Sequence, residues 1–159
     1  DCPPRLDYAT MNAIYAATGL IIPVCPGFTD FTSTGQYCDL LADLLQTIDT
    51  RAETAKDFDF VSVLTTRLNV QDDSQKQISR WMGALFGKML LGNNAVQSVA
   101  VEFAAMNVET LYELDVSKYN RKTYQRARES MDEVNEEILN IMRNVWESSQ
   151  QEDLLEVVG

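Results

Sequence analysis

The sequence predicts an α/β protein, with a parallel sheet that carries helices on both faces. Strand-like and helix-like segments alternate along the 159 residues, and the connections between them are short. This alternation is typical of right-handed β–α–β units. The hydrophobic content of 45 % and the charged content of 23 % fit one folded domain of ordinary composition.

The first half of the chain predicts two helices and two strands. A short Ala-rich helix is expected over 10–17, with Gly19 in the position of its C-cap. The compact apolar run 20–24 predicts a strand that a Pro-Gly pair terminates. Apolar residues at steps of three and four predict a helix over 34–48. The segment 58–64 is rich in aromatic and β-branched residues and predicts a buried central strand.

The second half predicts three helices and a third strand. One helix is expected to begin after Asp72 and to end at Gly87. Its packed face is expected to carry five apolar residues, namely Ile78, Trp81, Met82, Leu85 and Phe86. Residues 88–91 predict a short strand, and helices follow over 96–106 and 121–146.

The last helix carries apolar residues at alternating steps of three and four from Tyr124 to Val145. This seam fits either a dimerising coiled coil or a helix packed on its own sheet, and the second is favoured. Acidic residues are expected to form the outward face, namely Glu129, Asp132, Glu133, Glu136 and Glu137. The chain divides into a domain over 1–147 and an acidic tail over 148–159 that is expected to fray.

The composition excludes several classes of protein. There is no histidine, which removes Ser-His-Asp catalysis, Cys-His catalysis and histidine-ligated zinc. The three cysteines form no C-x-x-C pair and fit reduced cytoplasmic thiols. No apolar run approaches the roughly 18 residues of a membrane span. The formal net charge of −11 argues against a surface that coats nucleic acid or an anionic membrane as a whole.

The chain begins with an Asp-Cys-Pro-Pro run. Because proline cannot continue a strand ladder, we expect Asp1 to stand at the carboxyl tip of a strand upstream of this sequence. A carboxylate there can hold Mg²⁺ through water beside the phosphates of a nucleotide. The alternatives are that Asp1 is only a turn former or an arbitrary first residue.

Thr65, Thr66 and Arg67 follow the predicted central strand directly. Ligands of parallel sheets bind outside the carboxyl ends of the strands, so these three residues are candidates for a ligand-binding edge. An ordinary polar loop is the alternative.

Five of the thirteen basic residues lie within residues 118–128, a stretch without any acid. These residues, called the basic cluster below, are Lys118, Arg121, Lys122, Arg126 and Arg128. Cations at a helix N-terminus oppose the helix dipole, so helix stability does not explain the cluster, whereas contact with DNA phosphates would. The alternative is a solvated face in which Arg128 pairs with Asp132 and Arg126 with Glu129. The sequence leaves both interpretations open.

The N-terminal segment resembles the switch II region of ParA-type Walker ATPases. The family pattern D-[CT]-P-P-x-L-x-x-x-T-x-N-A is matched at Asp1, Pro3, Pro4, Leu6, Thr10, Asn12 and Ala13. The segment VLTTRLNVQDDSQ is similar to the strand and base-edge loop of the family. The segments NNAVQSVAVEFAAMNVETLYEL and NRKTYQRARESMDEVNEEI most resemble the RepA partition proteins of repABC-type plasmids.

This resemblance implies a P-loop ATPase fold and a role in the segregation of low-copy plasmids. Such proteins form a homodimer on binding ATP, bind DNA non-specifically and are stimulated by a centromere-binding partner. In repABC systems they also help to repress their own operon. The resemblance further implies ATP or ADP and Mg²⁺ as cofactors of an intact parent, and a bacterial cytoplasmic location on the plasmid or nucleoid, away from membranes.

By residue match, the resemblance implies that Asp1 is catalytic and holds Mg²⁺ through water, and that Pro3 and Pro4 shape the switch II turn beside the nucleotide. Thr66 and Arg67 would lie near the adenine, and the basic cluster would face DNA. The phosphate loop of the family, K-G-G-x-G-K-[ST], and its switch I aspartate belong upstream and are not in this sequence.

Positioning and charge neutralisation make up nearly all of phosphoryl-transfer catalysis. We therefore expect this chain alone, the C-terminal portion of such an ATPase, neither to hydrolyse ATP nor to bind nucleotide tightly. The alternative function is a non-catalytic α/β interaction module that keeps only a partner- or DNA-binding surface.

Overall fold

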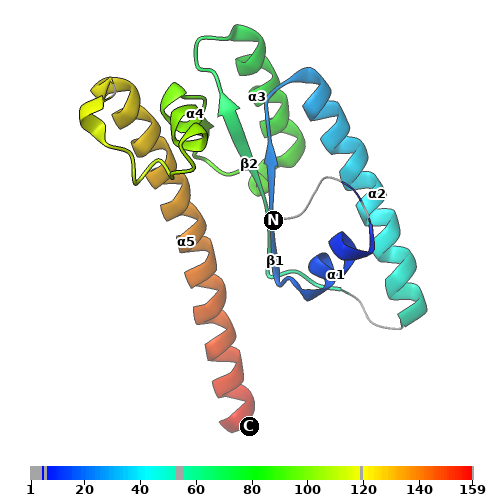
Figure 1. Cartoon of the computed structure of the whole chain (residues 1–159). Helices are drawn as coiled ribbons and strands as arrows, with labels where there is room; N and C mark the ends of the chain where they lie inside the picture. Colours follow the sequence, from blue (N-terminus) through cyan, green and yellow to red (C-terminus); the bar gives the residue numbers. More distant parts are fainter. Residues whose placement is uncertain (1–4, 6, 53–55, 119, 159) are drawn as a thin grey trace.

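The computed structural model shows a small sheet flanked by helices (Figure 1). It describes the backbone at the following positions: 5, 7–52, 56–118 and 120–158. Asp1, Pro3 and Pro4 therefore lie outside the described residues. No helix in the described part of the chain is both long enough and apolar enough to cross a membrane.

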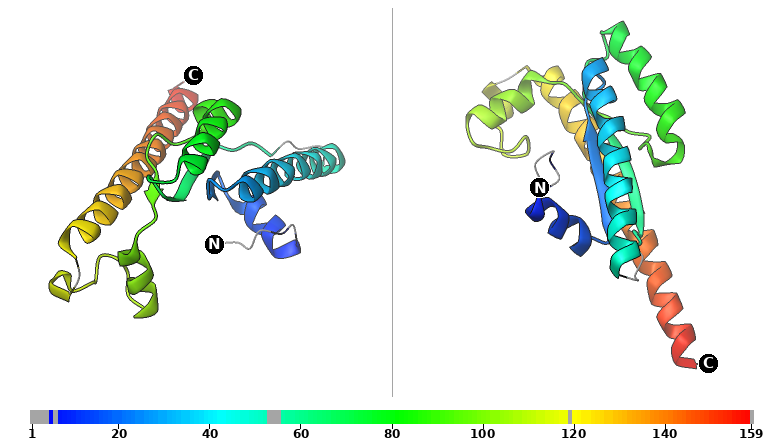
Figure 2. Two further views of the ribbon diagram at one scale, coloured as in Figure 1. Left: turned by 90° about the horizontal axis from the view of Figure 1, so that it is seen from above. Right: turned by 90° about the vertical axis from the view of Figure 1, so that its right-hand side faces the viewer.

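The described sheet has three parallel strands in the order β1-β2-β3. Strand β1 (Gly19–Val24) pairs with β2 (Phe60–Leu68) in a register that runs from Gly19 opposite Phe60 to Val24 opposite Thr65. Strand β2 then pairs with β3 (Ala95–Val96). Helices α1 and α4 lie on one side of the sheet and α3 on the other (Figure 2). The predicted α/β class with a parallel sheet is confirmed.

Five α-helices and two short 3-10 helices complete the described chain. Their bounds are α1 (Tyr8–Ala16), α2 (Phe28–Ala52), α3 (Asp73–Phe86), η1 (Gly87–Met89), α4 (Val99–Met106), η2 (Val116–Lys118) and α5 (Arg121–Val158). Helix α2 is longer at both ends than the predicted 34–48, because its first turn also packs: Phe31 contacts the core. Helix α5 likewise continues past the predicted end at 146.

The prediction that Gly19 caps the first helix is wrong. Ala17 is the C-cap of α1, in an extended conformation, and its N–H donates to the Ala13 carbonyl oxygen. Gly19 is instead the first residue of β1, where a Cβ atom would overlap the ring of Phe60. The close approach of this ring, rather than a helix end, requires glycine here.

Helix α3 has the predicted ends. The Asp72 carboxylate accepts hydrogen bonds from the backbone N–H groups of Ser74 (2.9 Å) and Gln75 (3.3 Å). The Ser74 hydroxyl also donates to this carboxylate (2.6 Å), and this bond, followed by the backbone bonds, holds the pKa of Asp72 below its ordinary value. Gly87 is the C-cap and has a φ of 52°, which glycine adopts without strain.

The main core lies between α3 and the sheet. It consists of buried Val24, Val63, Ile78, Met82 and Phe86. The predicted packed face is confirmed for the three α3 residues Ile78, Met82 and Phe86. It is wrong for Trp81 and Leu85, which are exposed. The buried residues follow a single row at steps of four that faces the sheet, and the other two lie on the neighbouring row.

The third strand does not lie where the sequence predicts it. Residues 88–91 contribute η1 and a single bridge between Leu90 and Val63. Strand β3 is formed at Ala95–Val96, which the sequence assigned in part to the helix over 96–106. That helix begins only at Val99, because the Ser98 hydroxyl oxygen accepts from the Ala100 N–H (3.2 Å) and caps it.

The first half of α5 packs within its own chain. Ala127 is buried together with Ala100 and Ala104 of α4, and Tyr124 and Met131 pack against the same cluster. The prediction that the apolar residues of this helix pack within their own chain is therefore confirmed for this part of α5, because these residues contact α4. The C-terminal half of α5 extends away from the sheet (Figure 1). The division of the chain at residue 147 stays a prediction.

Candidate functional site

Three groups of described residues are candidates for function: the basic cluster on η2 and α5, the ligand edge Thr66–Arg67 on β2, and the carboxylates of α5 near β3. The predicted site residues Asp1, Pro3 and Pro4 lie outside the described residues, and the side chain of Lys118 is not described.

Asn120 sets the start of α5 and thereby the place of the basic cluster. Its side-chain oxygen accepts from the N–H groups of Lys122 (3.0 Å) and Thr123 (3.2 Å). This N-cap satisfies two of the donors that a helix N-terminus leaves open. Arg121 and Lys122 therefore occupy the first turn, where both are exposed.

Arg128 is engaged by neighbouring side chains, although its own side chain is 39 % exposed. Its Nε lies 3.1 Å from an Asp132 carboxylate oxygen, and its Nη1 donates to the Tyr124 hydroxyl at 3.3 Å. Its guanidinium also stacks 4.1 Å from the centre of the Tyr112 ring. The bond to Tyr124, followed by the pairing with Asp132, raises the pKa of Arg128. The solvated-face alternative is confirmed for this pair.

Arg126 does not pair with Glu129 as that alternative predicted. Its Nη2 donates to the Gln97 carbonyl oxygen at 3.4 Å, while Glu129 accepts from Gln125 at 2.8 Å. The Gln97 N–H in turn donates to the Leu68 carbonyl oxygen at 3.0 Å. Arg126 is therefore fixed beside the carboxyl ends of β2 and β3, a long-range contact that spacing along the helix could not predict.

The ligand edge belongs to β2 itself and is not a loop after it. Strand β2 continues to Leu68, and its register with β3 shifts between Thr66 and Leu68. At this irregularity Arg67 has a φ of 53°, which is uncommon for any residue but glycine, and its side chain is exposed. The sequence placed these residues correctly at the carboxyl end of a parallel strand. It placed the end of that strand too early.

Thr65 presents a buried hydroxyl beside this edge. Its side chain is fully buried, and its Oγ1 has no hydrogen-bond partner in the described part of the chain. Burying a hydroxyl without a partner costs free energy, so we expect Thr65→Val to raise the free energy of unfolding by about 1 kcal/mol. Urea unfolding measures this, with the half-buried Thr66→Val as the control. A large loss of stability in Thr65→Val would show that the hydroxyl has a partner.

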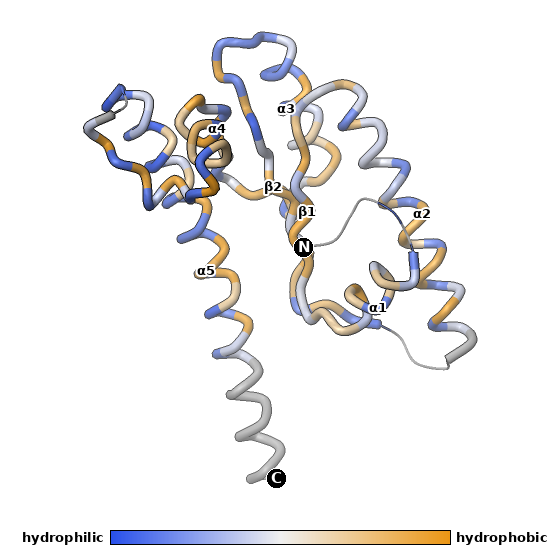
Figure 3. The backbone as a smooth tube through the Cα atoms, in the orientation of Figure 1, coloured by the Kyte–Doolittle hydropathy of each residue, from blue (hydrophilic) through white to orange (hydrophobic). Residues whose placement is uncertain are grey.

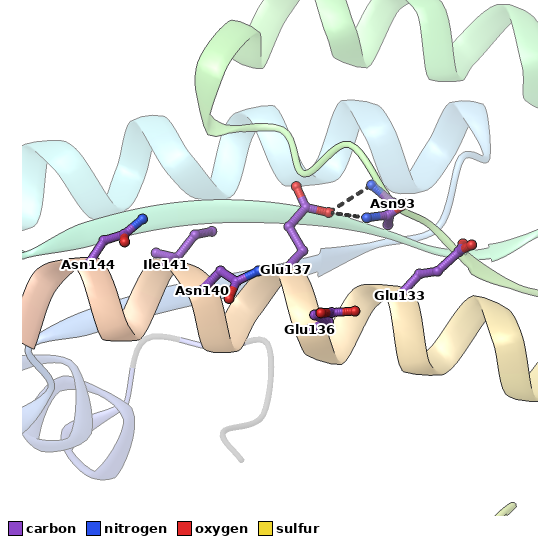
Figure 4. Close-up of a pocket in the computed structure, with 7 residues that line it drawn as sticks. All are labelled: Asn93, Glu133, Glu136, Glu137, Asn140, Ile141 and Asn144. Carbon is purple, nitrogen blue, oxygen red and sulfur yellow. Dashed lines mark hydrogen bonds between the residues drawn. The ribbon is translucent and has the colours of Figure 1, made fainter.

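Glu137 does not lie on an outward acidic face, as the sequence predicted. Its carboxylate accepts from the N–H of Gly92 (2.7 Å) and from the N–H and side-chain amide of Asn93 (both 2.9 Å). Figure 4 shows Glu137 pointing from α5 to Asn93, across a shallow cavity of about 390 Å³. The cavity is lined by Asn93, Glu133, Glu136, Glu137, Asn140, Ile141 and Asn144.

Ser130, which the sequence analysis missed, forms a second tie between α5 and the sheet edge. Its hydroxyl accepts from the Val96 N–H (3.0 Å) and donates to the Asn94 carbonyl oxygen (2.7 Å). The sequence does contain a pattern that could have predicted the contacts of Ser130 and Glu137 with the sheet edge. Both residues lie on the same face of α5 as three apolar residues, in a series spaced by three and four: Ala127, Ser130, Val134, Glu137 and Ile141.

Two observations limit the chemistry of the described residues. No group of three or more cysteine, aspartate or glutamate side chains in the described part of the chain is placed to hold a metal ion. A larger groove of about 1050 Å³ lies between α1, β1 and α2, with Ile14, Ile21 and Leu41 among its mainly apolar walls. Among the residues that the structure describes, its ionisable wall residues include Asp30 but no lysine or arginine.

Comparison with known proteins gives three relevant similarities, and no family model matches the chain. The chain is 37 % identical over 147 residues to "Putative replication protein A" of Sinorhizobium fredii, which covers 92 % of this chain and 36 % of that protein. It is 33 % identical over 146 residues to the protein of the same name from Rhizobium rhizogenes, with the same coverage. It is 30 % identical over 117 residues to "Protein SopA" of Escherichia coli K12, or 71 % of this chain and 28 % of that protein.

These similarities support a plasmid partition-related family for this chain. They agree with the resemblance of the sequence motifs at this general level. The chain spans about a third of the length of the rhizobial relatives, where the match covers 36 %. The activities of the whole proteins are therefore proposals for this chain.

Proposed function

We propose that this chain is part of a plasmid-partitioning ATPase of the ParA/RepA type. In this proposal an ATP-dependent homodimer binds DNA non-specifically, on the plasmid or nucleoid in the bacterial cytoplasm, and represses its own operon. A centromere-binding partition protein stimulates the ATPase. The proposal is supported by the resemblance of residues 1–13 to the switch II pattern, together with similarity to rhizobial replication proteins over 92 % of the chain.

The site residues have separate roles in this proposal. Asp1 holds Mg²⁺ through water, and Pro3 and Pro4 shape the turn beside the ATP phosphates. Thr66 and Arg67 contact the base of the nucleotide; their position at the carboxyl end of a parallel strand supports this role. These 159 residues contain neither the phosphate loop nor the switch I aspartate of the family pattern, and we propose that they do not hydrolyse ATP on their own.

The contacts of the basic cluster refine its proposed role on DNA. Arg128 is engaged by Asp132 and Tyr124. The proposal assigns the other four cations to phosphates, which requires Arg126 to give up its long bond to the Gln97 carbonyl oxygen (3.4 Å). Each phosphate contact contributes about −0.9 to the slope of log affinity against log salt concentration. Five contacts would give a slope of about −4 to −5, and four give about −3 to −4.

We expect the slope to identify which cations touch DNA. Arg121→Gln and Lys122→Gln should each make the slope shallower by about 1, because each removes one phosphate contact. Arg128→Gln is the matched control and should leave the slope unchanged. Fluorescence anisotropy with a labelled duplex over a salt series measures all three. The measurement is made on the intact protein with ATP; absence of binding by its ATP-bound homodimer at low salt, or a slope that responds to Arg128→Gln alone, would contradict this role of the cluster.

The second candidate function is a non-catalytic interaction module. It is favoured by the exposed apolar residues of α4 and the loop after it. The two candidates differ in their need for nucleotide: DNA binding by the partition protein requires its ATP-bound homodimer, whereas a module that keeps only a partner- or DNA-binding surface requires no ATP.

A further inference from the structure

Arg121 and Arg128 lie on the same side of α5, whose first turns are strongly hydrophilic (Figure 3). They are seven residues apart, which is close to a whole number of helical turns, so both side chains leave the helix in nearly the same direction. The rise of the helix separates them by about 10 Å along its axis. A DNA duplex laid along this side would therefore meet both residues.

Three neighbouring side chains hold the Arg128 guanidinium in place. Its Nε lies 3.1 and 3.4 Å from the two carboxylate oxygens of Asp132. Its Nη1 donates to the Tyr124 hydroxyl at 3.3 Å, and the group lies 4.1 Å from the centre of the Tyr112 ring. The positive charge of Arg128 is therefore compensated within its own chain.

Asp132 is itself held from a second side. The Tyr112 hydroxyl donates to its carboxylate at 2.8 Å, and the Asn135 side-chain amide donates to that hydroxyl at 3.0 Å. Leu111, next to Tyr112, is buried in one cluster with Ala127 of α5. An isolated exposed ion pair contributes little, because both side chains must be ordered to form it. Here the ordering is shared with contacts that the fold makes anyway.

The pairing removes Arg128 from the charge that DNA would meet. Affinity for DNA rises through counterion release when a net cation neutralises a phosphate. The Arg128–Asp132 pair has no net charge, and its carboxylate would repel an approaching phosphate. Arg126 differs, because its partner is the neutral Gln97 carbonyl oxygen. The Arg128 side chain is 39 % and that of Asp132 51 % exposed, so a phosphate can approach both.

We propose that Asp132 is a built-in restraint on DNA binding, which withholds Arg128 from the phosphates. When the charge of Asp132 is removed, Arg128 becomes a further phosphate contact on the side of α5 that carries Arg121. The inference rests on the proposed DNA binding and deepens it, because it gives an acidic residue a role in setting the affinity. One additional phosphate contact changes affinity about fivefold at roughly 0.15 M salt.

A charge-removing substitution tests the restraint in the intact protein with ATP. Asp132→Asn keeps the shape of the side chain and an oxygen acceptor for Tyr112. Fluorescence anisotropy with a labelled duplex should give a slope of log affinity against log salt concentration that is steeper by about 1. Glu129→Gln is the matched control, because it removes the same charge from α5 but Glu129 bonds to Gln125 and not to an arginine. Its slope should equal that of the wild type.

A double variant identifies Arg128 as the source of the gain. Asp132→Asn combined with Arg128→Gln should return to the wild-type slope, since the released cation is no longer present. An unchanged slope in Asp132→Asn, an equal steepening by Glu129→Gln, or a gain that persists in the double variant would overturn the restraint while the proposed DNA binding stands. Absence of DNA binding by the wild type and by Asp132→Asn alike would overturn both.

Discussion

Replacing Met82 by alanine is expected to lower the free energy of unfolding by about 3 kcal/mol, within the usual range of 2–5 for a buried methionine. Met82 is completely buried and packs between α3 and the sheet with Val24 and Val63. The truncation removes its apolar contacts and leaves a cavity that rigid strands β1 and β2 cannot close. Urea unfolding followed by circular dichroism measures the change.

Leu85→Ala is the matched control for this prediction. It removes a similar side chain from the same helix, but Leu85 is 57 % exposed, so we expect a change below about 0.5 kcal/mol. Equal losses in the two variants would show that α3 packs through a different row from the one described.

Replacing Glu137 by alanine is expected to cost about 2 kcal/mol and to loosen α5 from the sheet. The carboxylate accepts from the backbone N–H groups of Gly92 and Asn93, at 2.7 and 2.9 Å, and its loss leaves both donors to solvent or unpaired. Hydrogen bonds to a charged acceptor contribute roughly 1.5–3 kcal/mol, and the partial exposure of this one places the estimate toward the lower end. Glu136→Ala, an exposed neighbour on α5, is the control.

Amide hydrogen exchange locates the effect of Glu137→Ala. The amides of Gly92 and Asn93 should exchange faster, while those of α3 keep their protection, because the two regions have different anchors. Unchanged exchange at both amides would contradict the anchoring role. Since α5 also carries the basic cluster, the same variant tests whether DNA binding requires a docked α5.

The local part of this structure could be predicted from the sequence. Asp72 and Gly87 bound α3 because capping depends on residues within one turn. The Arg128–Asp132 pair was foreseen because residues four apart are neighbours on any helix. The parallel α/β class followed from alternating periodicities, which are also local.

The candidate site was predictable only in part, because some of its contacts join residues that are far apart in the sequence. The positions of Thr66 and Arg67 at a strand end followed from the β–α–β order, but the bulge that puts Arg67 at a positive φ depends on how β3 pairs. Arg126 donates to the carbonyl oxygen of Gln97, which is distant in the sequence, and not to the nearby Glu129. The spacing of residues along a helix does not predict such a long-range contact.

The sequence by itself determined the α/β class, both ends of α3, three residues of its packed face and the family resemblance, because each depends on the order of neighbouring residues. The tertiary structure decided where the third strand forms, which acids are outward and which surface stays uncovered. Strand β3 lies at Ala95–Val96 because Ser130, 34 residues from Val96, holds its N–H group. Glu137 faces inward because two backbone donors of a sheet edge lie there. Unpaired backbone groups must find partners wherever the fold brings them, and that requirement acts between segments far apart in the chain.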